Sequence, residues 1–338
     1  KLRIPEILAP AGGREQFFAA LHAGADAVYL GLEKFNARAR AQNFSLEDLS
    51  ELLPIARRYG MRVLLTLNVV IKENEVAELV KTLARLEPLG IHALIIQDLG
   101  LARLVKNHFP SFRLHASTQM AVHNLAGVIV AKQLGFKRVV LARELTAVEI
   151  RKIRDALPED EVQLEAFCHG SLCYSYSGLC FFSGARDARS GNRGECAYTC
   201  RKPYKILNEK GQGFLFSMRD LDTSADLKDL AGSGIDALKI EGRKKTRSTW
   251  RRRFVFTGSV WTNGPDIPLS APRRRTRRAN SPLTPSRSKT TGPFLFNARE
   301  RLFFSKAATT KMSSTSTSLR TAASASAPSK GLNTVSFA

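Results

Sequence analysis

The sequence predicts a TIM-type (β/α)8 barrel within residues 1–245 of the 338-residue chain. The first reason is a repeat in which a helix end, a glycine and a short apolar strand follow one another, at Gly24, Gly60, Gly90, Gly135 and Gly234. The second reason is that helical patterns separate these strands, and such alternation is typical of a parallel sheet. Eight strands without a phosphate-loop signature favour a closed barrel over a flavodoxin-like open sheet.

Each repeat has the features that its elements need. The glycine stands where a helix end requires a left-handed residue, and the run after it is rich in Val, Ile and Leu, as a strand buried on both faces requires. The predicted strands span 6–9, 27–32, 62–68, 93–98, 113–117, 138–143, 162–167 and 237–241.

Helices are predicted between these strands, among them 45–58, 74–86 and 146–157. Ser45 suits the position before a helix, and Glu47 and Asp48 suit its first turn. No helical pattern follows the eighth strand, so we expect the barrel to lack its last helix. A cysteine-rich insertion, 168–201, is expected after strand seven.

Charge is unevenly distributed along the chain. The whole chain has 52 Lys and Arg against 30 Asp and Glu, whereas residues 246–338 have 17 against 2 and thus carry +15 of the net +22. The total charge therefore does not by itself indicate a nucleic-acid-binding protein. No apolar run is long enough for a membrane span, and no export signal is visible, so we expect a cytoplasmic protein without a membrane segment.

The residues after Lys245 form a second region, 246–338, predicted to be a disordered basic tail. The ordinary interpretation is an RNA-binding arm. A frameshift is favoured instead, because codons for Thr246 to Thr257 can be read two bases later as Pro-Leu-Tyr-Val-Ala-Ala-Ala-Val-Arg-Val-Tyr. That apolar-faced helix is the element expected after the last strand.

Polar side chains gather at the predicted carboxyl ends of the strands, where barrels of this kind carry their chemistry. They are Asn68, Gln97, Asp98, His115, Ser117, Gln119, Arg143, Glu144, His169, Glu241 and Arg243. Each one alone is explained by capping or hydrogen bonding, but together they predict a site for a polar, anionic ligand. The candidate catalytic residues are His115, Gln119, Glu144, His169 and Glu241, and the candidate substrate-binding residues are Arg143, Arg186, Arg193 and Arg243.

The five cysteines all lie between Cys168 and Cys200, which indicates a metal or redox site rather than a disulfide framework. Four of them have the spacing Cys173-x6-Cys180-x15-Cys196-x3-Cys200. Four thiolates hold either zinc or a four-iron four-sulfur cluster. The wide, uneven gaps favour the cluster, with zinc as the alternative.

Cys168 is the odd fifth thiol, and we predict that it is a small buried residue. The alternative is a nucleophile beside His169, as in a cysteine peptidase. That dyad is disfavoured because neighbours on a strand point to opposite faces.

At these residues the chain resembles the collagenase-like peptidase U32 family. The resemblance covers about 1–245 and rests on Glu165-x-Phe167-x2-Gly170-Ser171-Leu172-Cys173-x4-Gly178-x-Cys180 and on Asn192-Arg193-Gly194-x-Cys196-x3-Cys200-Arg201. It includes Ile7 to Gly12, His115 to Gln119, Ala142 to Glu144 and Lys239 to Arg243. The segments at 115–119 and 142–144 look most like those of the members that hydroxylate a ribosomal RNA cytidine.

The resemblance implies two kinds of activity. The family name implies proteolysis, whereas better-understood members are iron–sulfur proteins that hydroxylate a pyrimidine of transfer or ribosomal RNA at C5, with prephenate as an implicated co-substrate. By position, Cys173, Cys180, Cys196 and Cys200 would be the cluster ligands.

The chemistry favours a hydroxylase over a peptidase. A peptidase needs an activated nucleophile or a metal-bound water, and no such pattern stands out. Hydroxylation of an unactivated ring carbon needs a redox cofactor, which four clustered cysteines can hold. The alternatives are a peptidase and a non-catalytic binding or partner subunit with a structural cluster.

An RNA substrate predicts a basic path with interleaved aromatic residues. The path would comprise Arg186, Arg189, Arg193, Arg201, Lys202 and Lys205 with Tyr174, Tyr176, Tyr198 and Tyr204. The alternative is a solvated loop whose cations offset the charge of the cluster.

Overall fold

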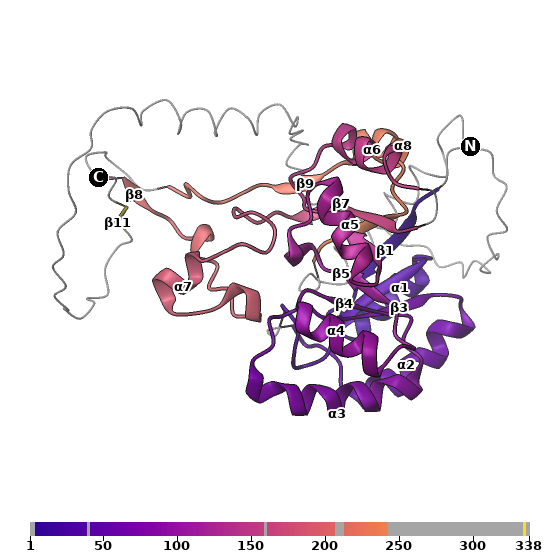
Figure 1. Cartoon of the computed structure of the whole chain (residues 1–338). Coiled ribbons are helices and arrows are strands. Elements are labelled where there is room, and N and C mark those ends of the chain that lie inside the picture. Colours follow the sequence, from indigo (N-terminus) through magenta and orange to yellow (C-terminus); the bar gives the residue numbers. More distant parts are fainter. Residues whose placement is uncertain (1–3, 39–40, 159–160, 207–212, 243–333, 336–338) are drawn as a thin grey trace, which may run out of the picture. The chain divides into compact units, whose positions relative to one another are not determined.

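The computed structural model describes residues 4–38, 41–158, 161–206, 213–242 and 334–335 (Figure 1). The chain divides into two compact units, and the described residues all belong to the unit formed by 1–255 and 329–338. The predictions for Arg243 and for the missing last helix lie outside the described residues. So do those for the tail 246–338, apart from the two-residue strand β11, Thr334–Val335, which pairs with β8, Lys205–Ile206.

Eight parallel strands form a closed barrel, as predicted. They are β1 (Glu6–Pro10), β2 (Ala27–Gly31), β3 (Arg62–Leu67), β4 (Ala93–Ile96), β5 (Leu114–Ala116), β6 (Phe136–Val140), β7 (Gln163–Ser171) and β10 (Ala237–Ile240). Each pairs with the next, and β10 pairs with both β7 and β1. That last pairing closes the barrel, and every strand edge within it is paired.

Helices alternate with the strands: α1 (Arg14–His22), α2 (Leu46–Arg58), α3 (Val76–Leu86), α4 (Leu99–His108), α5 (Leu125–Gln133), α6 (Ala147–Asp155) and α8 (Leu227–Gly232). The predicted start of α2 is confirmed, because Ser45 Oγ accepts from the Asp48 N–H at 3.0 Å and Asp48 accepts from the Ser45 N–H at 3.1 Å. The five repeat glycines are also confirmed as left-handed, with φ between 66° and 98°.

The sequence missed the elements between β7 and β10. Strand β7 runs on to Ser171, past its predicted end at 167, and there pairs with the antiparallel strand β9, Asp220–Asp222. Helix α7, Phe182–Asp187, lies between these two strands, in residues 172–206, which we call the cysteine-bearing segment. Helix α8 follows β9. Short strands and one-turn helices have too few residues to show a period, which is why sequence patterns do not reveal them. Within the described residues, no helix is both long and apolar enough to cross a membrane.

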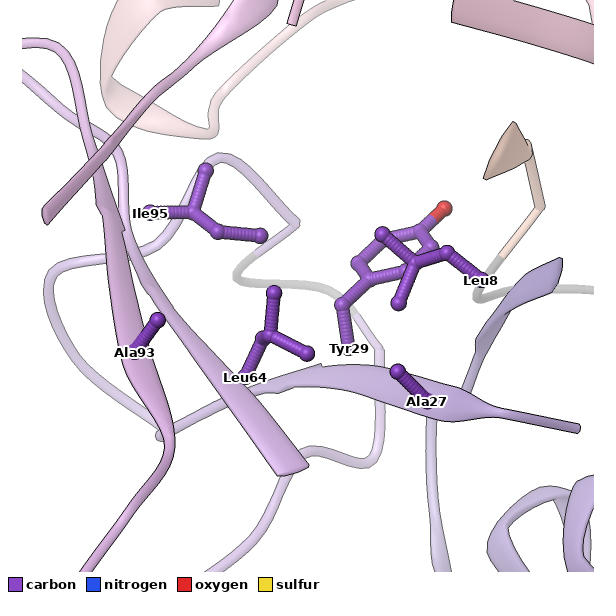
Figure 2. Close-up of a cluster of buried hydrophobic side chains, with 6 residues drawn as sticks. All are labelled: Leu8, Ala27, Tyr29, Leu64, Ala93 and Ile95. Atoms are coloured by element: carbon purple, nitrogen blue, oxygen red, sulfur yellow. The ribbon is translucent and has the colours of Figure 1, made fainter. Parts of the chain in front are cut away.

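Apolar side chains from neighbouring strands fill part of the barrel interior. Leu8, Tyr29, Leu64 and Ile95 lie together with Ala27 and Ala93, and all six are at most 3% exposed (Figure 2). Alternate residues of each strand point inward, and in such barrels the inward-pointing residues of alternate strands stack in layers. Burial of this kind contributes about 25 cal/mol per Å² of apolar surface.

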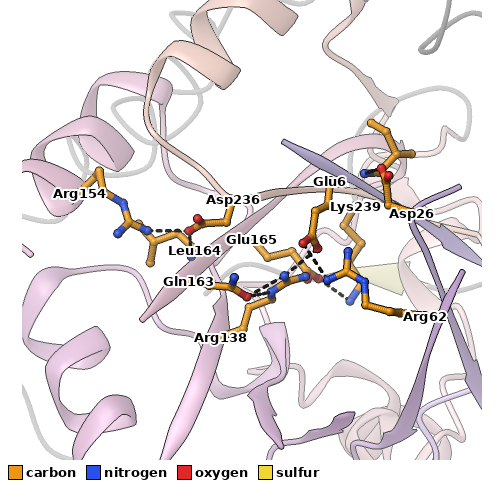
Figure 3. A network of polar contacts seen from close by, with 11 residues as sticks. Glu6, Asp26, Arg62, Arg138, Arg154, Gln163, Leu164, Glu165, Asp236 and Lys239 are labelled. Atoms are coloured by element: carbon orange, nitrogen blue, oxygen red, sulfur yellow. Dashed lines mark hydrogen bonds and ion pairs between the residues drawn. The ribbon is translucent and has the colours of Figure 1, made fainter. Parts of the chain in front are cut away.

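A network of polar contacts joins charged side chains of several strands (Figure 3). Arg138 bonds to Glu6 at 2.7 Å, to Gln163 at 2.7 Å and to Glu165 at 3.3 Å. Buried charges are stable only when paired, and this arginine is surrounded by acceptors from β1 and β7. Burial alone would raise the pKa of Glu6, but the bonds from Arg62 and Arg138 outweigh it and lower that pKa.

Candidate functional site

The polar residues predicted at the rim do not all reach it. His115 is the middle residue of the three-residue strand β5 and its side chain is 3% exposed, so it lies inside the barrel. Its neighbours in the ladder are Ile95 and Arg138. Burial lowers the pKa of His115 well below its usual value, and the positive charge of Arg138 lowers it further. His115 is therefore buried within β5, one residue before its end at Ala116, and is not exposed at the rim as expected.

Two predicted residues meet where β7 and β10 end. The Glu241 N–H donates to the His169 carbonyl at 2.8 Å, and Glu241 Oε1 pairs with Arg38 at 2.9 Å. Gly170 is needed beside them, because its φ is +116° and a Cβ there would lie 2.5 Å from the Glu241 carbonyl oxygen. The carboxylate of Glu241 is the main cause that raises the pKa of Arg38.

Arg38 is a rim residue that the sequence analysis missed. It lies in the loop after β2, where Asn36 Oδ1 accepts from the Arg38 N–H at 2.7 Å. Asn68, from the end of β3, accepts from the neighbouring Ala37 N–H at 3.1 Å. The polar residues after the second strand were a visible sign of a functional loop at this place. The pairing of Arg38 with Glu241 joins residues near the two ends of the barrel sequence, and no local pattern predicts it.

Arg143 and Glu144, which follow β6, face the cysteine-bearing segment. The Arg143 guanidinium lies 4.4 Å from the centre of the Phe167 ring and donates to the Ser171 carbonyl at 3.3 Å. Glu144 accepts from the Ser177 N–H at 3.1 Å and from its hydroxyl at 3.0 Å. These contacts hold residues on both sides of Cys173 at the end of the barrel.

Gln119 also contacts this segment. Gly178 has a φ of +80°, and a Cβ there would lie 2.0 Å from the Gln119 carbonyl oxygen, so only glycine allows the two backbones to approach so closely. The side-chain Oε1 of Gln119 and Nδ1 of His115 are buried atoms with no hydrogen-bond partner among the described residues. Such atoms are candidates for a bond to a ligand.

The four predicted ligand cysteines influence one another. Burial raises the pKa of Cys173, and the thiols of Cys180 and Cys196 raise it further, while Arg143 lowers it. Burial also raises the pKa of Cys200, with added contributions from Cys173, Cys196 and Cys180. The environment of these two thiols thus includes the other predicted ligand cysteines, although the segment between Cys173 and Cys200 is long.

This donor set fits an iron–sulfur cluster in the kind of ligand that it offers, because thiolates hold such clusters. All four thiols are free, and Cys196 Sγ accepts from the Tyr198 N–H at 3.4 Å and from the Ser183 hydroxyl at 3.9 Å. Hydrogen bonds to sulfur are one of the means by which proteins tune such clusters. In the described part of the chain, no three His, Cys, Asp or Glu side chains stand at distances that would hold a metal ion.

Cys168 is buried, as predicted, with its side chain bonded to the Lys239 carbonyl at 3.5 Å. Burial raises its pKa to about 12. A thiol in this state is not a nucleophile, because the reactive form is the thiolate.

The structure shows that some residues of the predicted basic path are engaged within the protein, whereas others are exposed. Arg193 pairs with Glu75, and Arg201 donates to the Leu172 carbonyl at 2.8 Å, so both side chains hold the segment together. Tyr204 is 3% exposed, whereas Tyr174, Tyr176 and Tyr198 are between 43% and 54% exposed. Arg186 is exposed, and it bonds to the Tyr204 hydroxyl at 3.3 Å. Phe181, which the sequence analysis did not include, is 80% exposed.

Comparison with known proteins identifies the family. The model of peptidase family U32 matches residues 12–253. The chain belongs to this family. It is 40% identical over 248 residues to the Escherichia coli 23S rRNA 5-hydroxycytidine C2501 synthase, covering 72% of this chain and 37% of that protein.

Other members of the U32 family have different names. The chain is 34% identical to the Bacillus subtilis tRNA hydroxylation protein P1, over 72% of this chain and 59% of that protein. It is also 34% identical to a Porphyromonas gingivalis protein named collagenase, over 71% of this chain and 61% of that one. The U32 chain thus spans between about a third and three fifths of these curated relatives.

Proposed function

We propose that this U32 protein is a hydroxylase of RNA that adds oxygen to C5 of a pyrimidine and uses a four-iron four-sulfur cluster held by Cys173, Cys180, Cys196 and Cys200. The observation that carries the proposal is the set of four free thiols in one segment, which Glu144 bonds to the carboxyl end of the barrel and Arg201 joins across its two halves. Relatives named as rRNA and tRNA hydroxylation proteins support it. Such an enzyme would act in the cytoplasm.

The cluster would supply the redox chemistry that no side chain provides. The residues of the chain then have binding and orienting roles. Arg143 would bind an anionic group at the rim, such as a carboxylate of prephenate, the expected co-substrate, and Arg38 would keep Glu241 in place. Gln119 Oε1, which is buried and has no partner among the described residues, would accept a hydrogen bond from the substrate.

Glu144 and Glu241 have positioning roles in this proposal, because their carboxylates are engaged by Ser177 and Arg38. His169 remains the candidate at the rim for moving a proton. His115 would not serve at the rim, since it lies buried inside the barrel.

An RNA strand would reach this site along the exposed aromatic side chains beside the cysteines. Tyr174, Tyr176, Phe181 and Tyr198 would stack on unpaired bases, and Arg186 would contact phosphate. Arg193 has a different role, because Glu75 already neutralises its charge.

The alternatives have less support from the site. For a peptidase, the thiol beside His169 is buried and its pKa is raised to about 12. A binding subunit with a structural cluster would have the same cysteines, so only activity separates it from the hydroxylase.

The test is mass spectrometry of ribosomal and transfer RNA from a strain that lacks the full-length gene. Loss of one hydroxylated pyrimidine, restored by the wild-type gene and not by a Cys173→Ser gene, is the expected result. Intact RNA together with collagen cleavage by the purified protein would establish the peptidase instead. A colourless, anaerobically purified protein that contains one zinc would overturn the cluster.

A further inference from the structure

The cysteine-bearing segment has two halves, and each half is held by a different carboxylate of the barrel. Ser177, between Cys173 and Cys180, is bonded to Glu144 after β6. Arg193, three residues before Cys196, is bonded to Glu75 in the turn Glu73–Glu75 that precedes α3. The two attachment points therefore follow β6 and β3, which are not neighbours in the barrel.

The Glu75 attachment is built to be rigid. Arg193 Nη1 lies 3.0 Å from Glu75 Oε2, and Nη2 bonds to the other carboxylate oxygen, so the contact is bidentate. Glu75 also accepts from the Lys72 N–H at 2.8 Å. The bond from Arg193 is the main cause that lowers the pKa of Glu75, so the carboxylate stays charged. Gln97 Nε2 donates to the neighbouring Asn192 carbonyl at 3.3 Å.

The Glu144 attachment is buried. Ser177 is 6% exposed, and its hydroxyl accepts from the Arg143 N–H at 3.2 Å while it donates to Glu144. Gly178 then packs directly on the Gln119 backbone. The first half is thus fixed through side-chain bonds and through backbone contact.

The two halves are joined to each other as well. Arg201, next to Cys200, donates to the Leu172 carbonyl at 2.8 Å, next to Cys173. Ser183 Oγ donates to Cys196 and accepts from the Ala197 N–H at 3.1 Å. The distance between the two cysteine pairs is therefore set by contacts that do not involve the sulfurs of Cys173, Cys180 or Cys200.

The geometry points to Glu75 and Glu144 as positioning residues of the cysteine site: each holds one pair of thiols, so that the rigid barrel sets the separation of the pairs. This inference rests on the proposed cluster. Residues that hydrogen-bond to the metal-binding residues fix the orientation of those ligands, and their loss typically weakens metal binding about 10- to 100-fold. Neither carboxylate contacts the sulfurs, so each acts only through Arg193 or Ser177.

The test measures how fast anaerobically purified protein loses its absorption near 400 nm to an iron chelator. Glu75→Gln keeps the size of the side chain and its bond to the Lys72 N–H, and it should speed the loss about tenfold. Glu144→Ala should do the same. The matched controls are Glu78→Gln on α3, which pairs with Lys34, and Glu149→Gln at the start of α6, and both should lose iron at the wild-type rate.

Double variants show whether each carboxylate acts through its partner. If it does, Glu75→Gln combined with Arg193→Gln loses iron no faster than either single variant, and Glu144→Ala with Ser177→Ala no faster than Glu144→Ala alone. Effects that multiply would overturn the inference. So would a wild-type rate in both single carboxylate variants.

A second measurement does not need the cluster. In metal-free protein, Glu75→Gln and Glu144→Ala should expose the segment 172–206 to limited proteolysis sooner than the wild type and the controls. Equal cleavage rates would contradict the inference. A wild-type protein that binds no iron would instead refute the proposed cluster, while faster proteolysis in the two variants would still support the attachments.

Discussion

Lys239 and Glu165 form an ion pair across the seam that closes the barrel, with Lys239 Nζ 2.9 Å from Glu165 Oε1. The side chains are 6% and 0% exposed, and the Lys239 ammonium lies 4.4 Å from the centre of the Tyr29 ring. A buried pair of this kind has little net stability to contribute, but breaking it leaves a buried charge without its partner. Pairing β10 with a strand other than β7 would leave Lys239 and Glu165 buried without each other, so the ion pair favours the observed pairing of β10 with β7.

Lys239→Met should lower the free energy of unfolding by about 3 kcal/mol, because Glu165 then keeps only Arg138 as a charged partner. Adding Glu165→Gln should recover part of the loss, since no unpaired charge remains. Urea unfolding monitored by circular dichroism measures both. Lys34→Met, which removes an exposed pair with Glu78, should cause no measurable change. Equal effects of the buried and exposed variants would contradict the prediction.

We predict that the folded protein loses stability as the pH falls, and that His115 is one cause. Burial, with Arg138, His92, Lys239 and Arg62 nearby, lowers its pKa well below the usual value in the folded protein. In the unfolded chain it binds a proton below a pH of about 6.5, so the unfolded state binds more protons there. The neutral imidazole therefore makes its full contribution to the free energy of unfolding above a pH of about 6.5, and this contribution decreases as the pH falls below that value. His92 acts in the same direction, because burial lowers its pKa to about 4.

Urea unfolding at pH 7 and pH 5 measures this dependence. His115→Gln should reduce the slope of stability against pH by up to one proton, which is about 1.4 kcal/mol per pH unit. Replacing the exposed His123 by Gln serves as the control, and it should retain the wild-type slope. The prediction fails if the two variants have the same slope.

Gly178 is predicted to be irreplaceable where it contacts the barrel. Gly178→Ala places a Cβ 2.0 Å from the Gln119 carbonyl oxygen and puts alanine at a φ of +80°, which itself costs about 1–2 kcal/mol. The segment should detach, and limited proteolysis should cut it sooner. Gly191→Ala in the same segment meets no atom within 4 Å, so its digestion pattern should match the wild type. Similar cleavage of both variants would count against the attachment.

The barrel could be predicted from the sequence because its signals are local. Each left-handed glycine, such as Gly60 and Gly90, ends a helix a few residues before an apolar strand, and both were confirmed. The start of α2 was predicted for the same reason, since Ser45 and Asp48 bond to each other across one turn.

The site could be predicted only in part, because its contacts join distant residues. The role of Cys173, Cys180, Cys196 and Cys200 as ligands stays a prediction from their spacing. Arg38 with Glu241 and Glu75 with Arg193 connect loops that are more than a hundred residues apart. No periodicity encodes such pairs. Burial is equally hard to predict for a single residue, and so His115 was placed at the rim although it lies inside the barrel.

The frameshift predicted for the residues after about Lys245 is tested by the coding DNA. We expect the frame two bases later to stay open and to encode further amphipathic helices. A protein translated in that frame after Lys245 should then be more soluble than this chain, because its closing helix would cover apolar surface of the barrel. A stop codon within a few codons of that frame would restore the RNA-binding arm as the better interpretation.

The last prediction concerns the exposed aromatic side chains beside the cysteines. Phe181 is 80% exposed, and stacking of one base on such a ring is worth about 1–3 kcal/mol. Phe181→Ala should therefore weaken binding to single-stranded RNA at least about fivefold without changing the dependence on salt. Arg186→Glu with Arg189→Glu should weaken binding and also flatten the salt dependence, because phosphate contacts are lost.

Fluorescence anisotropy with a labelled RNA oligonucleotide, measured at several salt concentrations, separates the two effects. The matched control is Tyr59→Ala, which removes another exposed ring, 65% exposed, after the end of α2 and so at the opposite end of the barrel from the cysteine-bearing segment. Its affinity should equal that of the wild type. If the Phe181 and Tyr59 variants bound RNA equally well, the strand would not pass the cysteines, and the basic residues there would serve only to offset the charge of the cluster.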